Sequence, residues 1–353
     1  MNAMNRAYVL TEIKKLELRK LPMPEIRSDE VLIKMGAIGV CGSDVHYFNH
    51  GRIGDFIVDF PFILGHECAG IVVKTGENVK NLKVNDRVAL EPGVPCGKCR
   101  MCRTGHYNLC PDMHFLATPP YNGCLMEYMA YPAEYTYRLP DNMTLEQGAL
   151  VEPMAIGMNA VLTGQVKAGD HVVVLGAGCI GLVSLLAANA SGAASVTITD
   201  TIPLRRETAM KLGATVALDA AGDVTEEVLR LTDGYGADVV IDCAGFSPTV
   251  RSALKFVRPA GRIVIVGMGT DYLDQIPLGP ISTKEIEITS IFRYKNLYPA
   301  TIAAISGGKV DINGIVSKRF AFEDTPSAYN SASENPTETV KNIILFGGVE
   351  GET

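Results

Sequence analysis

The segment His171-Val-Val-Val-Leu-Gly176-Ala-Gly178-Cys-Ile180-Gly181 joins a short apolar run to three glycines in a Gly-x-Gly-x-x-Gly spacing. The run predicts a buried strand, and the apolar stretch that continues to Ala190 predicts a helix. A second strand, Val196 to Asp200, ends in an acid about 20 residues further along. A strand before the glycines, a helix after them and this acid together predict a dinucleotide-binding βαβ unit.

Each glycine of this motif has a physical role in such a unit. Gly176 permits the tight turn, Gly178 lets the backbone approach a pyrophosphate together with Ile180, and Gly181 lets helix and strand pack closely. The N-terminus of the helix favours the diphosphate charge. The alternative is a glycine-rich turn that binds no ligand.

The acid at the end of the second strand predicts the choice of cofactor. Asp200 would accept hydrogen bonds from the adenine ribose, which favours NAD because the 2′-phosphate of NADP would meet a carboxylate. Arg205 follows closely and is predicted to lie over the adenine or to contact the ribose.

Strands and helices alternate from His171 to Thr289, which predicts a doubly wound parallel sheet of six strands. Gly245 and Gly267 follow the fourth and fifth strands, at the carboxyl edge where nicotinamide is expected. The fold class is therefore α/β for this part of the chain.

The first 90 residues contain short strand-like runs separated by prolines and glycines, which is typical of a β barrel or sandwich. Within this region Cys41 and the pair His66-Glu67 offer a thiolate, an imidazole and a carboxylate. Zn²⁺ binds these groups, and a catalytic site leaves a fourth position open. Alternatively, Cys41 is a small core residue and His66-Glu67 simply starts a strand.

A group of four cysteines between residues 96 and 110 is a more specific metal-binding pattern than Cys41 with His66-Glu67. Four thiolates at this spacing can close a tetrahedral zinc shell within one loop and leave no position open for substrate, so they predict a structural zinc. Two disulfides and an iron–sulfur cluster are the alternatives. The four cysteines are Cys96, Cys99, Cys102 and Cys110.

Composition excludes several classes of protein. The net charge of −7, without a basic patch, argues against binding nucleic acid. Residues 1–20 lack the apolar core of a signal peptide, and glycines and a serine interrupt the most apolar segment, Val172 to Ala190, so no membrane span is expected. Nine cysteines, four of them bunched, favour a reducing compartment. We predict a cytoplasmic protein.

The spacing of apolar residues changes after Thr144, because Leu145 to Leu162 has helical spacing. This stretch contains Glu152 followed by Pro153, and a proline tends to bend or end a helix. We place one domain at 156–292 and the other at 1–155 together with 293–353. The tail is too short to fold alone, so it is expected to return to the first domain.

Two zinc patterns and a dinucleotide motif in one chain resemble the medium-chain, zinc-dependent alcohol dehydrogenase superfamily over essentially the whole length. Within it the sequence is most similar to the sorbitol and xylitol (polyol) dehydrogenases. The segments that carry this similarity are Cys41–Tyr47, Phe115–Pro120, Val151–Pro153 and Ile291–Tyr294. The resemblance implies a GroES-like β-rich catalytic domain beside a Rossmann domain, and a homotetramer or homodimer.

The resemblance also implies an activity: hydride transfer from a secondary hydroxyl of a polyol to NAD⁺, giving a ketose. Cys41, His66 and Glu67 would hold the catalytic zinc, and Glu152 would bind the metal or its water. Because one thiolate and one carboxylate neutralise Zn²⁺, we expect only one of the two glutamates on the metal at a time.

Further roles follow from the resemblance. Ser43 and His46 would carry the hydroxyl proton to solvent, although Ser43 could be a helix N-cap and His46 could make a simple structural hydrogen bond. A pocket rich in donors and acceptors suits a polyol, and Arg293 could alternatively be a surface ion pair. The implied pocket residues are Tyr47, Phe115, Thr118, Glu152, Arg293 and Tyr294.

Two other functions fit the same motifs. Members of the superfamily that act on threonine, glucose or butanediol with NAD are one alternative. A regulator that binds NAD and zinc without catalysis is another, and the presence of Ser43, His46 and Glu152 argues against it.

Overall fold

The computed structural model describes residues 4–270 and 272–347, and the chain forms two compact units. The first unit contains the residues up to Glu152, Tyr298–Ser306 and the residues from Val316 onward. The second contains Pro153–Leu297 and Gly307–Ile315. The sequence prediction put the junctions at 155 and 293, and did not foresee that Gly307–Ile315 joins the second unit.

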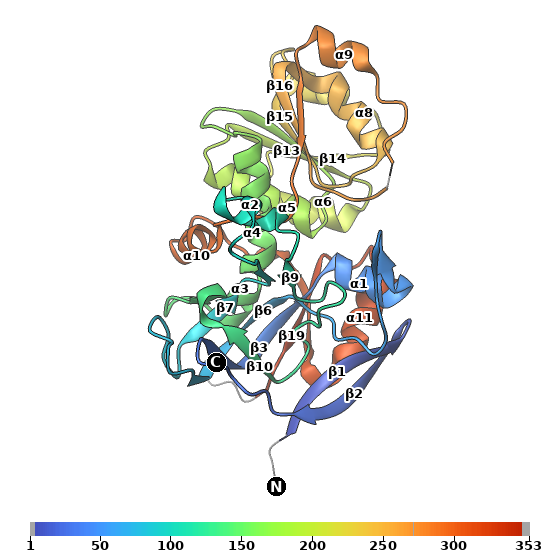
Figure 1. Cartoon of the computed structure of the whole chain (residues 1–353). Helices are drawn as coiled ribbons and strands as arrows, with labels where there is room; N and C mark the ends of the chain where they lie inside the picture. The colour runs from blue at the N-terminus through green and yellow to red at the C-terminus, as the bar shows by residue number, and fades with distance from the viewer. Residues whose placement is uncertain (1–3, 271, 348–353) are drawn as a thin grey trace. The chain divides into compact units, whose positions relative to one another are not determined.

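The second unit is built on a six-stranded sheet in which every strand pair is parallel. The sheet order is β14-β13-β12-β15-β16-β17, so the order reverses beside β12 (Figure 1). This confirms the predicted doubly wound sheet. Its strands are β12 (His171–Leu175), β13 (Ser195–Asp200), β14 (Val216–Asp219), β15 (Ala237–Asp242), β16 (Val257–Ile265) and β17 (Glu287–Ser290).

Helices connect these strands, as the alternating pattern predicts. The helix with the most apolar sequence, α5, follows β12 and buries most of its side chains. The helices of this unit are α4 (Val151–Thr163), which starts in the first unit, α5 (Cys179–Ala190), α6 (Pro203–Lys211), α7 (Thr225–Leu231), α8 (Ser247–Phe256) and α9 (Leu278–Thr283).

The first unit is rich in short strands. Its main sheet has the order β11-β7-β6-β3-β19-β18, with β10 also paired to β3. The strands are β1 (Met4–Glu12), β2 (Lys15–Pro22), β3 (Glu30–Val40), β4 (Arg52–Ile53), β5 (Phe56–Ile57), β6 (Glu67–Thr75), β7 (Arg87–Leu90), β8 (Gly93–Val94), β9 (His114–Phe115), β10 (Tyr128–Pro132), β11 (Thr136–Arg138), β18 (Val316–Ala321) and β19 (Lys341–Leu345).

Five helices accompany this sheet. In Figure 1, α1 and α11 lie next to each other, although the 274 residues from Gly51 to Asp324 separate them in the sequence. The helices are α1 (Gly42–His50), α2 (Arg100–Arg103), α3 (Leu145–Ala149), α10 (Tyr298–Ser306) and α11 (Thr325–Glu334).

The predicted helix from Leu145 to Leu162 is two helices, α3 and α4. Thr144 caps α3 with a reciprocal capping box to Gln147. Pro153 neither bends nor ends a helix, because it lies in the first turn of α4, where its missing N–H costs no intrahelical bond.

The C-terminal tail returns to the first unit, as expected. Strand β19 inserts between β3 and β18, and Asn342 pairs with Val40. This insertion completes the sheet and brings a segment near residue 341 next to the strand that leads into Cys41.

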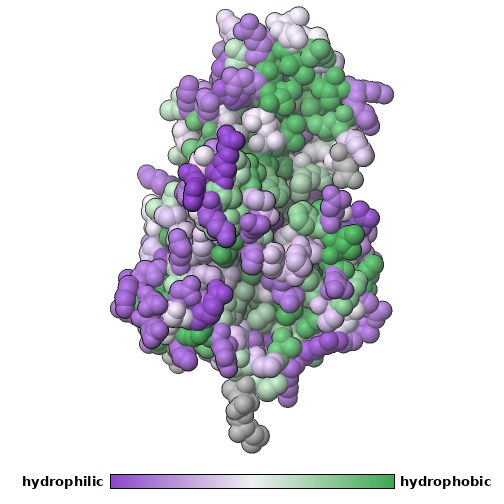
Figure 2. Space-filling view, viewed as in Figure 1, coloured by the Kyte–Doolittle hydropathy of each residue, from purple (hydrophilic) through white to green (hydrophobic). Residues whose placement is uncertain are grey.

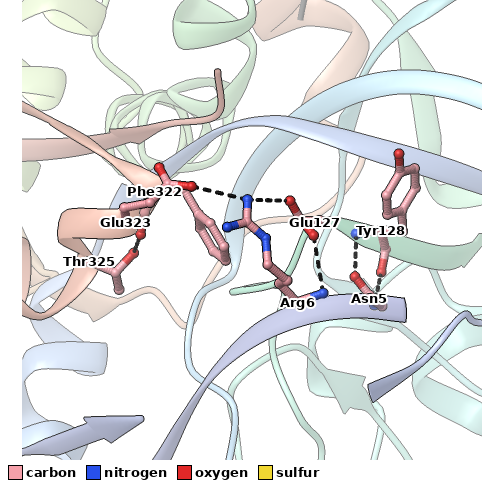
Figure 3. A network of polar contacts seen from close by, with 7 residues as sticks. All are labelled: Asn5, Arg6, Glu127, Tyr128, Phe322, Glu323 and Thr325. Atoms are coloured by element: carbon pink, nitrogen blue, oxygen red, sulfur yellow. Dashed lines mark hydrogen bonds and ion pairs between the residues drawn. The ribbon is translucent and has the colours of Figure 1, made fainter. Parts of the chain in front are cut away.

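A polar network connects strand β1 to the segment at Glu127–Tyr128 and to the C-terminal segment at Phe322–Glu323 (Figure 3). Arg6 contacts Glu127 at 2.6 Å and Glu323 at 3.0 Å, and its guanidinium lies 5.5 Å from the ring centre of Phe322. Asn5 exchanges two hydrogen bonds with the backbone of Tyr128. Three segments far apart in sequence are thereby held together around one core.

Within the described ranges, 4–270 and 272–347, no helix has both the length and the apolar character that a membrane span requires.

Candidate metal and cofactor sites

The sheet of the first unit brings Cys41, His66 and Glu67 together. Cys41 follows β3 directly and is the N-cap of α1, while Glu67 opens β6 with His66 just before it. β3 and β6 are neighbours, and Gly39 pairs with Glu67 across them. One ligand atom from each of the three residues lies within 4.8 Å of the others.

These three groups fit a zinc ion. A thiol, an imidazole and a carboxylate form the donor set of a catalytic zinc site with a position left open. The imidazole and the carboxylate are buried, and an added Cβ at Gly39 would overlap the carboxylate of Glu67, so glycine is needed there to make room. The two alternatives for Cys41 and His66-Glu67 as ordinary structural residues do not explain this convergence.

Asp44 orients the imidazole and was not found by sequence reasoning. It lies on α1, is fully buried, and its Oδ2 is 3.2 Å from Nδ1 of His66. Burial lowers the pKa of His66, but Asp44 and then Cys41 more than offset this effect, so that pKa lies well above its ordinary value. A carboxylate on the second ring nitrogen is the usual partner of a metal-binding histidine. Asp44 lies within the Cys41–Tyr47 segment, but nothing in the sequence indicates that it contacts His66.

Lys341 is the second residue that sequence reasoning missed. Its Nζ donates to both carboxylate oxygens of Glu67, at 2.7 and 2.8 Å, and to the carbonyl of Val40 at 3.2 Å. Lys341 is 2% exposed and Glu67 is 1% exposed. The one sequence signal was a lysine at the start of an apolar strand near the C-terminus.

Ser43 lies next to the metal ligands. Its hydroxyl donates to Sγ of Cys41 at 3.3 Å. The N-cap alternative is wrong, because Cys41 is the N-cap and Ser43 stands inside α1.

His46 lies one turn further along α1, with an exposed side chain. Its ring is 4.6 Å from that of His50, and burial together with His50 lowers its pKa below the ordinary value. Glu152 is buried in the first turn of α4 at the edge of the first unit. Among the described residues, it does not belong to the group of three whose ligand atoms converge.

The four-cysteine lobe forms a compact set of sulfurs. Ligand atoms of Cys96, Cys99, Cys102 and Cys110 all lie within 4.8 Å of one another. The Cys99 and Cys102 sulfurs are 3.4 Å apart, far beyond a disulfide bond of about 2.05 Å. All four are free, so the disulfide alternative is wrong.

The spacing of the sulfurs indicates the kind of metal. A tetrahedral zinc with bonds of about 2.3 Å needs sulfurs about 3.8 Å apart, which is close to the observed separations. A cluster of several iron atoms would need a wider set. Backbone N–H groups of Lys98 and Cys99 lower the pKa of Cys96 to about 7, whereas burial raises the pKa values of Cys102 and Cys110.

The glycine loop of the second unit has the geometry that the sequence predicts. Gly176 has φ 91°, and a Cβ at Gly181 would overlap the carbonyl oxygen of Gly176. Gly178 is the N-cap of α5, and Ile180 lies in its first turn. The loop therefore lies at the N-terminus of α5, and a helix N-terminus is suited to bind a diphosphate.

Asp200 is tied to this loop. Its Oδ2 accepts from the N–H of Ala177 and its Oδ1 from the N–H of Ile202, each at 2.8 Å. Nη1 of Arg205 lies 3.7 Å from Oδ2. The carboxylate is thus held at the end of β13 by the backbone on both sides.

Gly245 and Gly267 come together at the carboxyl ends of β15 and β16. Gly245 has φ 72°, and a Cβ there would overlap the carbonyl oxygen of Gly267. The two glycines let the two strand-end loops approach closely.

The predicted pocket residues fall in both units. Phe115 of β9 lies with its ring 5.7 Å from that of His66, so it faces the metal ligands. Tyr47 is buried, with its ring 6.5 Å from that of Phe62, and Thr118 bridges to Tyr121.

Arg293 and Tyr294 belong to the second unit. The guanidinium of Arg293 lies 4.7 Å from the ring centre of Phe292, and Tyr294 is buried. Each unit by itself therefore holds only a part of the predicted pocket.

Comparison with known families agrees with this division. Residues 27–141 match the family described as alcohol dehydrogenase GroES-like domain, and residues 179–307 match the zinc-binding dehydrogenase family. The first match covers both groups of predicted zinc ligands, and the second begins inside the glycine loop.

Full-length relatives are similar as well. A sorbitol dehydrogenase of Bacillus subtilis is 41% identical over 342 residues, which are 96% of each chain. A putative D-xylulose reductase of Agrobacterium fabrum is 40% identical and covers 97% of this chain and 99% of its own.

A solved structure extends the comparison to the fold. The crystal structure of an oxidoreductase/dehydrogenase of unknown specificity from Escherichia coli superimposes with a TM-score of 0.93 at 40% identity, covering 98% of this chain and 100% of that chain. The site geometry, both family matches and these relatives agree, and the chain belongs to the polyol branch of the medium-chain, zinc-dependent alcohol dehydrogenases.

Proposed function

We propose that this protein is an NAD-dependent polyol 2-dehydrogenase, which transfers a hydride from a secondary hydroxyl of xylitol, sorbitol or a similar polyol to NAD⁺ and yields the ketose. The observation that carries the proposal is the convergence of Cys41, His66 and Glu67, with the Ser43 hydroxyl beside them, in a chain that also has a dinucleotide loop. The similarity to sorbitol dehydrogenase supports the substrate class.

The roles of the residues follow from their chemistry. When bound, zinc acidifies a coordinated hydroxyl and the nicotinamide accepts a hydride. Cys41, His66 and Glu67 would hold the metal. Ser43 would accept the hydroxyl proton while its own proton passes to water, and His46, whose pKa is lowered by burial and by His50, would pass a proton from water to solvent.

Lys341 changes the expected charge at the metal. Its ammonium already compensates the Glu67 carboxylate, so approach of Glu152 does not require Glu67 to leave for the charges to balance. We therefore propose that Glu67 would keep its place when a metal is bound, and that Glu152 or water could take the remaining position.

We propose NAD as the cofactor and two zinc ions per chain. Asp200, held at the strand end by two backbone N–H groups, is positioned for ribose hydroxyls, and Arg205 and the Gly245–Gly267 contact would line the adenine and nicotinamide ends. The second zinc belongs to the four-cysteine lobe.

Assembly as a homotetramer or homodimer is also proposed. β17 is an edge strand, and edge strands present unpaired backbone groups. In the segment before β17, the side chains of Met268, Tyr272 and Leu278 are 76%, 77% and 71% exposed. Figure 2 shows apolar surface over the part of the second unit that carries α8 and α9. Light scattering of the wild type and a Leu278→Glu variant tests this, and a monomeric wild type would contradict it.

We propose the cytoplasm as the location. All nine cysteines are free, and a cluster of four thiols that binds a metal suits a reducing compartment.

A substrate panel tests the proposed activity. Purified protein is assayed with NAD⁺ and with NADP⁺ against xylitol, sorbitol, threonine, glucose and 2,3-butanediol. The expected result is NAD⁺ reduction with a polyol as the best substrate. Turnover of only the last three would favour the other dehydrogenases, and nucleotide binding without any turnover would favour the regulator.

A further inference from the structure

Tyr329 is a buried tyrosine on α11 that the proposed chemistry does not use. It is 0% exposed, and its hydroxyl has no hydrogen-bond partner within the described part of the chain. Leaving a buried hydroxyl without a hydrogen bond destabilises the folded state, so a native protein rarely keeps one without a use. A phenylalanine would fill the same space without this cost.

α11 packs on α1, and the Tyr329 ring lies against the buried face of α1 that carries Asp44. The ring lies 5.5 Å from that of Phe48, and Phe48 follows Asp44 by one helical turn on the same buried face of α1. Asn342 of β19 holds α11 in place by donating to the carbonyl of Ala328, the residue before Tyr329.

Several acidic groups raise the pKa of the Tyr329 hydroxyl. Burial raises its pKa well above the ordinary value, and Asp44, Cys124, Cys41 and Glu67 raise it further, in that order. The hydroxyl therefore keeps its proton and is a donor. The first of these acids, Asp44, is the charge that acts on it most strongly.

Asp44 is the complementary group. Its carboxylate is fully buried, and neither oxygen has a hydrogen bond within the described residues, although Oδ2 lies 3.2 Å from Nδ1 of His66. The Tyr329 hydroxyl on α11 and Oδ1 of Asp44 on α1 are therefore a buried donor and a buried acceptor on two packed helices, each without a hydrogen bond among the described residues. One water can satisfy both when it has polar groups on two or more sides.

We propose that Tyr329 is a positioning residue for the metal site: its hydroxyl donates through one buried water to Asp44 and so holds that carboxylate against Nδ1 of His66. The inference rests on the proposed metal site. It assigns the hydroxyl, rather than the ring, a role in orienting the imidazole.

The test compares Tyr329→Phe with the wild type as zinc-loaded proteins. Loss of a direct partner of a metal-binding histidine costs about 10–100-fold in affinity, so a partner one step further out should cost about 3–10-fold. We expect zinc transfer to a chelator to accelerate by this factor, and the visible absorption bands of the cobalt-substituted protein to shift. In the polyol assay, kcat should fall with KM unchanged.

Tyr8→Phe is the matched control. Tyr8 is also buried in the first unit, and its hydroxyl donates to the carbonyl of Glu323 at 2.7 Å, so this variant loses a hydroxyl without touching Asp44. It should leave zinc transfer and the cobalt bands unchanged.

The Asp44→Ala background, which has no side-chain oxygen to accept from the water, separates a water-mediated role from packing. There, Tyr329→Phe should change zinc transfer by less than twofold. An equal effect in both backgrounds, or no effect of Tyr329→Phe in the wild type, would overturn the proposal. If no polyol is turned over, zinc transfer and the cobalt bands still decide the question.

Discussion

Lys341 donates to both carboxylate oxygens of Glu67 in a salt bridge that is almost completely buried. The pair joins the last strand of the chain to the start of β6, and so connects the C-terminal return to the metal ligands. Desolvation makes such a pair costly to form and much more costly to break, because removing one partner leaves an uncompensated buried charge.

Replacing Lys341 with methionine should therefore destabilise the metal-free protein by about 3–5 kcal/mol. In the zinc-loaded protein the metal itself compensates Glu67, so the loss should be smaller. Urea unfolding of both forms measures the difference.

Lys284→Met is the matched control for this experiment. Nζ of Lys284 donates to the carbonyls of Leu254, Lys255 and Val257 and to no carboxylate. The loss of stability in Lys284→Met should be the same with and without zinc. If Lys341→Met also lost the same stability in both forms, the metal would not compensate the charge of Glu67.

Mutations at the two proposed metal sites should have different effects on zinc content, stability and activity. Cys99→Ser should remove one zinc and lower the thermal midpoint while the remaining zinc and the kcat of the folded fraction persist, because a structural metal contributes folding free energy. Elemental analysis, calorimetry and the polyol assay measure these effects.

Cys41→Ser should instead remove the other zinc and abolish turnover. Cys243→Ser, at a free thiol of the second unit, should keep both metals. Activity retained by Cys41→Ser would refute the assignment of the catalytic ligands.

The second unit was the more predictable part of the fold. Its six strands alternate with helices, and the glycines after β12 and the acid at the end of β13 encode a local geometry that the structure confirms. Periodicity could not predict that Gly307–Ile315 belongs to the second unit, because that depends on packing between distant segments.

The candidate site divides in the same way. Cys41, His66 and Glu67 could be predicted because metal ligands are few in type. Asp44 and Lys341 could not, since each acts through a contact that only the fold makes. By residue type alone, either could have been a surface residue.

Glu91 predicts a pH dependence of stability. Its buried carboxylate accepts from the hydroxyls of Tyr107 at 2.6 Å and Tyr137 at 2.9 Å, and burial raises its pKa despite these bonds. Since the folded pKa is raised, the stability that Glu91 contributes is fully present below the unfolded pKa of about 4.5 and is lost as the pH rises through the folded pKa.

Relative to Glu91→Gln, the wild type should therefore become less stable as the pH rises from 4.5 toward neutrality. Chemical unfolding of both proteins at several pH values measures this difference. The exposed Glu226→Gln should show no such trend, and a difference between wild type and Glu91→Gln that does not vary with pH would contradict the prediction.

Asp200→Ala should change both cofactor preference and stability. Without the carboxylate, the 2′-phosphate of NADP no longer meets a negative charge, so the ratio of kcat/KM for NADP⁺ to that for NAD⁺ should rise about tenfold, a change of about 1.4 kcal/mol. The N–H groups of Ala177 and Ile202 lose their acceptor, which should cost about 1–3 kcal/mol of stability. Asp200→Asn removes the charge but keeps an amide oxygen, so it should show the same change in preference with a smaller loss of stability. An unchanged ratio in both variants would show that Asp200 does not read the ribose.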